Sequence, residues 1–175
     1  MSYDIYIGNG YMAVPTPVDD GTNEPHIEVK GMVHPEAPEF PGDTMTGKGN
    51  SRHPGYSQWS DFCEMAGLHD LFFGARWNGA GQAKPTRDMC LMRGHPGCAL
   101  LQPSDLLEIR QARERWEAKP WPTSERIPGW DPNFKWSDKG EGDPRYDNIL
   151  ARLLWLEWWV TWALANCETP CLFNR

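Results

Sequence analysis

The most informative stretch of the sequence is DNILARLLWLEWWVTWALAN, which runs from Asp147 to Asn166. With about 100° of rotation per residue, this stretch predicts a helix that is apolar on two roughly opposite faces. Such a helix is buried between two layers, or it presents one face to a partner. We therefore expect it at the centre of the fold. Aliphatic residues form one face and tryptophans the other: Ile149, Leu153, Leu156, Val160 and Leu164, against Trp155, Trp158 and Trp162.

Two charged residues lie within the apolar part of this predicted helix. Arg152 precedes Trp155 and Trp159 by about one turn, which predicts a cation–π contact with an indole ring. Glu157 lies near the aliphatic face, so its carboxylate needs a buried partner or a water-filled cavity.

The N-terminal residues predict β-structure. Apolar and polar residues alternate from Tyr3 to Ile7, and Asn9-Gly10 precedes a second apolar run that ends at Val14. Because Asn-Gly readily adopts the positive φ angles of a tight turn, this pattern predicts a β-hairpin. The segment Ile27–Val33 predicts a third strand.

A short helix is expected over Gln58–Ala66, with Ser57 as its N-cap and Gly67 as its stop. Residues 68–73 are expected to continue the core in an extended or 3₁₀ conformation. The apolar face of the helix carries Trp59, Phe62, Cys63 and Ala66.

Another helix is expected from Ser104, as its N-cap, to about Ala118, with Leu106, Ile109 and Trp116 facing inward. Its outward charges are spaced at i and i+4 and are interpreted as a solvated face. The pairs are Arg110 with Glu114 and Arg113 with Glu117.

Long loops connect these elements, since the 175 residues include 17 Gly and 16 Pro. The loops are expected at His34–Pro54, Asn78–Asp88 and Pro120–Pro144. Together the patterns predict a single α+β domain of residues 1–175. In it, an N-terminal hairpin and a third strand pack on two or three helices.

The formal net charge is −7, from 17 Lys and Arg against 24 Asp and Glu. Such an acidic chain argues against nucleic acid as a partner and favours basic partners. The N-terminus lacks the basic and apolar regions of a signal peptide, and no charge-free apolar run reaches the ~18 residues that a membrane helix needs. We therefore expect a cytoplasmic protein without a membrane segment, whose five cysteines are free thiols.

The strongest metal candidate is the segment from Cys90 to Cys98, which also contains His95. Two thiolates and an imidazole are zinc ligands, and Cys63 or the pair Cys167 and Cys171 would complete a four-ligand site. The spacing matches none of the established zinc patterns, so the alternative is that Cys90 and Cys98 are inert buried thiols.

Two loops are candidates for ligand or partner binding. The glycine-rich loop offers backbone amides and cations for an anion through Gly79, Gly81, Lys84 and Arg87, although it lacks the spacing of a phosphate-binding loop. Otherwise this segment is a surface loop. The second loop presents aromatic anchors at Trp121, Trp130 and Trp136.

General acid–base chemistry has weaker support. His53, Glu64 and the pair His69-Asp70 are the available groups, but no nucleophile motif accompanies them. We interpret His69-Asp70 as a local helix-end interaction. The tryptophan face of the last helix is either a stacking surface for a nucleobase or protein partner, or part of the core.

Five blocks resemble small accessory proteins of tailed phages and prophages, a family to which no activity is assigned. The resemblance implies a small acidic phage protein in a bacterial cytoplasm, whose role is to bind a host protein, a defence component or a signalling nucleotide. The blocks are Tyr3–Gly8, Tyr56–Cys63, Gly67–Phe73, Arg93–Cys98 and Ala151–Trp159.

The leading functional hypothesis is a non-catalytic accessory protein that occludes a host or defence protein or sequesters a small, nucleotide-like ligand. The loop His34–Pro54 and the two candidate loops would be its contact elements. A small Cys/His metal-dependent hydrolase is the alternative, and a virion or assembly protein is the second alternative.

Overall fold

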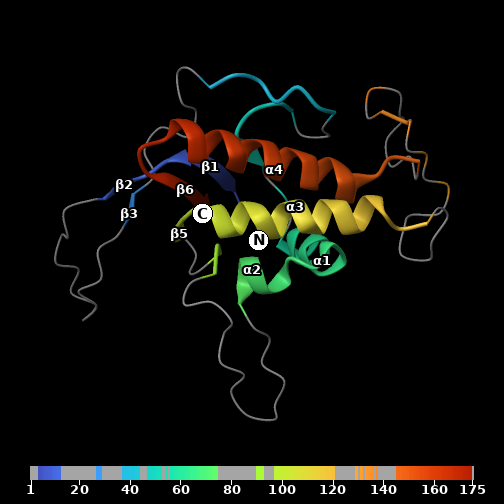
Figure 1. Ribbon diagram of the computed structural model, residues 1–175, viewed down its shortest axis with the longest axis horizontal. Helices are drawn as coiled ribbons and strands as arrows, with labels where there is room; N and C mark the ends of the chain where they lie inside the picture. Colours follow the sequence, from blue (N-terminus) through green and yellow to red (C-terminus); the bar gives the residue numbers. More distant parts are fainter. Residues whose placement is uncertain are drawn as a thin grey trace, which may run out of the picture.

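The computed structural model describes residues 4–12, 27–28, 37–43, 47–52, 54, 56–74, 90–92, 97–120, 129, 131, 133–135, 137 and 145–174. Helices α3 (Pro103–Glu117) and α4 (Asn148–Asn166) lie side by side and run in opposite directions (Figure 1). The shorter helices α1 (Tyr56–Ala66) and α2 (His69–Phe73) pack against each other and lie below α3 in Figure 1, and α1 contacts both α3 and α4. Among the described residues, no helix is long and apolar enough to cross a membrane.

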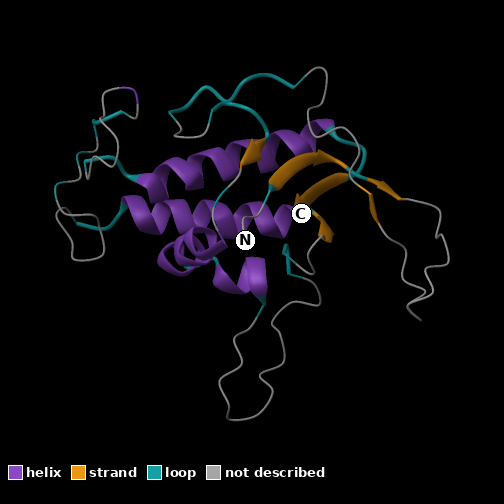
Figure 2. Cartoon of the chain, turned by 180° about the vertical axis from the view of Figure 1, so that it is seen from behind, coloured by secondary structure: helices purple, strands orange, loops and turns teal. Residues whose placement is uncertain are grey.

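A four-stranded antiparallel sheet lies at the end of the helix pair where α4 ends and α3 begins (Figure 2). Its strand order is β4 (Ser51–Arg52), β1 (Ile5–Asn9), β6 (Pro170–Asn174) and β5 (Gly97–Leu100). The strands β2 (Tyr11–Met12) and β3 (Ile27–Glu28) form a separate pair. The helices and an antiparallel sheet, which are separate in space although their strands and helices are interspersed along the chain, confirm the predicted α+β class.

The predicted hairpin between the first two strands is wrong, because β1 and β2 belong to different sheets. The Asn9 side chain accepts a hydrogen bond from Thr169 N at 2.7 Å, and Gly10 N donates to Thr169 O at 2.7 Å. The two residues therefore join β1 to the start of β6 instead of closing a turn. This long-range contact outweighs the local Asn-Gly preference.

The sheet core is built in register. Leu172 stands opposite Ile7 on one side and Ala99 on the other, and all three side chains are buried. On the other face, the rings of Tyr6 and Phe173 pair across strands with centroids 6.2 Å apart. Both faces of β1 are therefore covered.

The short helix α1 buries the four residues predicted for its apolar face, and Gly67, with φ of 71°, ends it as predicted. It begins at Tyr56, so Ser57 lies inside the helix and is not the N-cap. Residues 69–73 form the α-helix α2, a fourth helix where an extended or 3₁₀ segment was expected. The helix α3 is capped by Gln102 and Asp105 in place of Ser104, because their side chains and backbone amides bond reciprocally.

The aliphatic face of α4 is buried as predicted, apart from Leu164, which is only partly covered. The tryptophan face divides between the core and the surface. Trp155 is fully buried and donates from Nε1 to Gly49 O at 2.8 Å, whereas Trp158 and Trp162 are half-buried. Trp158 is thus the indole of this face that borders the surface site described below.

The cation–π contact predicted for Arg152 involves a different ring. Its guanidinium lies over Phe62 of α1, 5.7 Å from the ring centroid, and it donates to Gln58 O at 3.1 Å. The guanidinium that lies over the Trp155 ring is instead that of Arg52 in β4, 4.8 Å from the ring centroid. Burial lowers the pKa of Arg52 to about 9, so this guanidinium remains charged at neutral pH.

Candidate functional site

A groove of about 490 Å³ lies between α3, α4 and the segment 40–42. This volume lies within the range of small-molecule pockets. Most of its lining is apolar, and the charged groups lie along the α3 side and the middle of α4. The lining residues are Phe40, Pro41, Gly42, Arg110, Arg113, Leu154, Glu157, Trp158 and Thr161.

The aromatic wall of the groove is held in place by backbone contacts. Phe40 N donates to Lys48 O at 2.9 Å, which closes the loop between them. The Phe40 ring is 3% exposed and meets Trp158 edge-on, with centroids 5.8 Å apart. Gly42 lies against the Phe40 ring so closely that a Cβ atom there would overlap it. The wall is therefore positioned before any ligand arrives.

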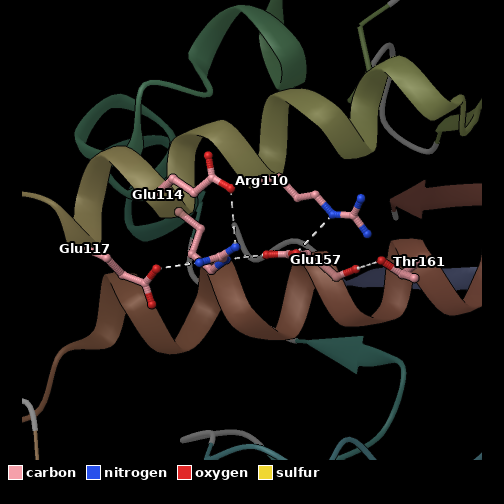
Figure 3. Close-up of polar contacts among 6 residues, drawn as sticks. Arg110, Glu114, Glu117, Glu157 and Thr161 are labelled. Carbon is pink, nitrogen blue, oxygen red and sulfur yellow. Dashed lines mark hydrogen bonds and ion pairs between the residues drawn. The ribbon is translucent and has the colours of Figure 1, made fainter.

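The charged side of the groove is organised around Glu157 (Figure 3). Its Oε1 atom accepts from Arg110 Nε at 3.1 Å, and its Oε2 atom accepts from Arg113 Nε at 2.5 Å. One carboxylate thus bridges two arginines of α3, and 19% of its side chain is exposed. The partner that the sequence requires for Glu157 is provided by these two guanidinium groups, of which that of Arg113 is the more buried.

The two arginines differ in how many of their guanidinium nitrogens are already engaged. Arg113 also pairs through its Nη atoms with Glu117 and Glu114, and its hydrogen bond to Glu157 raises its pKa. Arg110 uses only its Nε atom within the described part of the chain, and 46% of its side chain is exposed. Arg110, which lines the groove, therefore keeps the outer Nη edge of its guanidinium without a partner among the described residues.

The charge of the lining differs in sign from the charge of the chain. Two arginines and one glutamate leave the groove with one positive charge in excess, on a chain of net charge −7. Thr161 adds a hydroxyl that donates to Glu157 O at 2.7 Å and keeps its lone pairs for a ligand donor. The arrangement suits a partly apolar ligand that carries an anionic group.

A second cavity of about 320 Å³ is lined by Asp43 and shares Leu154 with the groove. Its charged lining comprises Asp43, Asp131, Asp147 and Lys135, so it is acidic. Asp147 accepts from Leu150 N and from Trp116 Nε1, both at 2.8 Å, and therefore serves the helix ends. This cavity does not match the groove as an anion site.

Most of the site residues predicted from sequence lie outside the described residues, so those predictions remain open. They are Gly79, Gly81, Lys84, Arg87, Trp121, Trp130, Trp136, His53 and His95.

The structure describes only some of the proposed zinc ligands. Cys90 is half-buried, and Cys98 is described only through its backbone in β5. Cys63, Cys90, Cys167 and Cys171 are free thiols, and burial raises the pKa of Cys63 well above its ordinary value. Among the described residues no group of three or more His, Cys, Asp or Glu side chains is arranged to hold a metal.

The acid–base candidates on the described helices are local. His69 Nδ1 lies 3.8 Å from Asp70 Oδ1, and its ring packs on Phe73 at 5.3 Å. This agrees with the predicted helix-end interaction. Glu64 is exposed on α1.

Sequence reasoning missed the bridge between α3 and α4. Arg110 and Arg113 were assigned to a solvated face, yet both reach Glu157 across the helix interface. The available signal was the pair of arginines at i and i+3 combined with a lone glutamate in an apolar helix. Arg113 does pair with Glu117 as predicted, whereas Arg110 pairs with Glu157 in place of Glu114.

No protein-family model, curated protein or solved structure matches the chain. Its function is therefore inferred from the chemistry of the groove.

Proposed function

We propose that this chain is a non-catalytic accessory protein that sequesters a small, planar, nucleotide-like anion in the groove between α3, α4 and residues 40–42. The observation that carries the proposal is the unoccupied Nη edge of Arg110 beside the half-buried Trp158, among the described residues. The resemblance to phage and prophage proteins favours a role in a bacterial cytoplasm.

Each part of such a ligand has a matching surface. A planar ring packs against Trp158 and the exposed Leu154, since base–aromatic contacts are sequence-tolerant and contribute about 1–3 kcal/mol per base. An anionic group receives two parallel N–H bonds from Arg110, the geometry that guanidinium groups favour. Thr161 accepts from a ring amine or a ribose hydroxyl.

The groove favours a small ligand over a protein partner. Phe40 and Trp158 already pack against each other edge-on, so little ordering entropy is lost on binding. One expected contact loop, His34–Pro54, supplies Phe40, Pro41 and Gly42 to this lining.

Calorimetric titration with adenosine 5′-monophosphate, cyclic adenosine monophosphate and 2-naphthoate tests the proposal. At least one of these planar anions is expected to bind to the wild-type chain. The variant Arg110→Gln should weaken that binding about tenfold to a hundredfold, as expected for the loss of a charge-assisted bond.

The matched control is Arg115→Gln, which removes the same charge from the same helix outside the groove lining. Trp158→Leu should also weaken binding. If none of the three anions binds, or if Arg115→Gln weakens binding as much as Arg110→Gln, the proposal is wrong.

A further inference from the structure

The charges around the groove restrict the ligand further than its shape does. All three guanidinium nitrogens of Arg113 already contact carboxylates. Nε pairs with Glu157, and the Nη atoms pair with Glu117 and Glu114. Within the described part of the chain, the Nη edge of Arg110 is the guanidinium edge left for an anion in the groove. One guanidinium edge matches the two oxygens of one carboxylate or one phosphodiester.

Additional negative charge on the ligand would meet carboxylates. Glu157 lies in the lining itself, 3.1 Å from Arg110, and Glu114 lies one turn further along α3 on the side of Arg113. Like charges at such separations repel, and the repulsion is larger in a partly desolvated groove than in bulk water. A polyphosphate would place several charges against a single excess positive charge.

Building on the proposed function, we infer that the ligand is an aromatic monoanion, with Glu157 as the residue that rejects higher charge. The class includes a cyclic or diester-linked nucleotide and an aromatic carboxylate. It excludes nucleoside triphosphates. Glu157 acts on specificity through two routes, since it neutralises one of the two arginines and fixes the direction of the Arg110 guanidinium.

The test compares ligands that share one ring and differ in charge, in calorimetric titrations of the full chain without divalent cations. The probes are adenosine, cyclic adenosine monophosphate, adenosine 5′-monophosphate and adenosine triphosphate. Cyclic adenosine monophosphate is expected to bind at least about tenfold more tightly than adenosine and than the triphosphate. Sodium 2-naphthoate tests whether the monoanion that binds is an aromatic carboxylate and not a nucleotide.

The variant Glu157→Gln keeps the side-chain shape and adds one positive charge to the groove. It is expected to shift the preference from the cyclic monoanion toward adenosine 5′-monophosphate by about tenfold. The control Glu168→Gln makes the same change in net charge at an exposed position beyond the end of α4 and should not shift it.

The outcomes separate the two proposals. Affinity that rises steadily from cyclic monophosphate to triphosphate overturns the monoanion inference and leaves the proposed function intact. An equal shift in Glu168→Gln and Glu157→Gln overturns the role of Glu157. The absence of binding by every probe overturns the proposed function, and the inference with it. Binding of 2-naphthoate alone supports the monoanion and identifies it as a carboxylate.

Discussion

Arg110 Nε donates to Glu157 Oε1 at 3.1 Å, although the two residues are 47 positions apart in the chain. The contact joins the middle of α3 to the middle of α4 (Figure 3), and both residues line the groove together with the segment 40–42. Because Nε is the atom engaged, the outer edge of the Arg110 guanidinium, with one N–H from each Nη, has no partner among the described residues. A contact between helices therefore also sets the direction of the group to which we assign the ligand anion.

The bridge should stabilise the fold as well as the groove. Glu157→Gln is expected to lower the free energy of unfolding by about 1–2 kcal/mol, because Arg113 loses a partner that is four-fifths buried. Urea unfolding checks this value. A double-mutant cycle with Arg113→Gln should give a coupling of about 0.5–1.5 kcal/mol. An uncoupled pair would show that the bridge is only a surface contact, and Glu168→Gln should change stability by less than about 0.5 kcal/mol.

Asp147 couples the start of α4 to the end of α3. Its Oδ1 atom caps α4 by accepting from Leu150 N, and its Oδ2 atom accepts from Nε1 of the buried Trp116. Asp147→Ala should lower the unfolding free energy by about 1–3 kcal/mol, because both donors lose their acceptor. Asp147→Asn retains one oxygen for the cap and should cost less. Chemical denaturation measures the unfolding free energy that each variant loses. Equal losses in the two variants would contradict the inference that Asp147 accepts from both donors.

Gly42 is required by the close approach of the Phe40 ring. A Cβ atom at this position would overlap the ring, which is packed edge-on against Trp158. We expect Gly42→Ala to displace Phe40, to cost about 1–3 kcal/mol as in other overpacked sites, and to weaken ligand binding. Gly49→Ala is the matched control, since nothing lies within 4 Å of its Cβ position. Equal unfolding free energies of the two variants would contradict this account.

Tyr146 should make the free energy of unfolding depend on pH in the alkaline range. Burial, followed by the negative charge of Asp43, raises the pKa of Tyr146 above its ordinary value. The native state therefore holds this proton more tightly than the unfolded state. The resulting stabilisation is complete below about pH 10 and is lost as the pH rises above that value.

The variant Tyr146→Phe isolates this effect. Relative to the wild type, its unfolding free energy should improve steadily as the pH rises above about 10. Arg52 has a lowered pKa and interacts electrostatically with Tyr146, so its slope of opposite sign above about pH 9 cancels only in part between the two proteins. Urea titrations between about pH 8 and pH 11 measure the difference. A constant difference over that range would show that the tyrosine titrates equally in both states.

Local patterns were sufficient to identify α1, α3 and α4, but not the short helix α2. The faces of α1 and α4 follow from residue spacing alone, because a helix satisfies its own backbone and its buried side follows the 3.6-residue period. The requirement for a partner to Glu157 was also visible in the sequence, since an ionised group on an apolar face is costly without one. The identity of that partner was not.

Strand pairing was beyond local reasoning. The alternation from Tyr3 to Ile7 predicted a strand, but its partner β6 begins about 160 residues later, as the contact between Asn9 and Thr169 shows. The strands β4, β5 and β6 are short, and their strand state depends on neighbours that supply the hydrogen bonds. A local turn preference at Asn9-Gly10 was therefore no guide to the pairing.

The amino-acid pattern alone determined the central, two-faced helix, the acidic net charge and the α+β class, because each depends on composition or on neighbours in the chain. The groove depended on the folded chain. Phe40, Arg110 and Glu157 come from distant segments, and the i, i+4 spacing of Arg110 and Glu114 favoured a partner that the structure does not use. Only the packing of α3 against α4 selects that partner, because it brings Glu157 within hydrogen-bond distance of Arg110 Nε and leaves the outer edge of that guanidinium without a partner among the described residues.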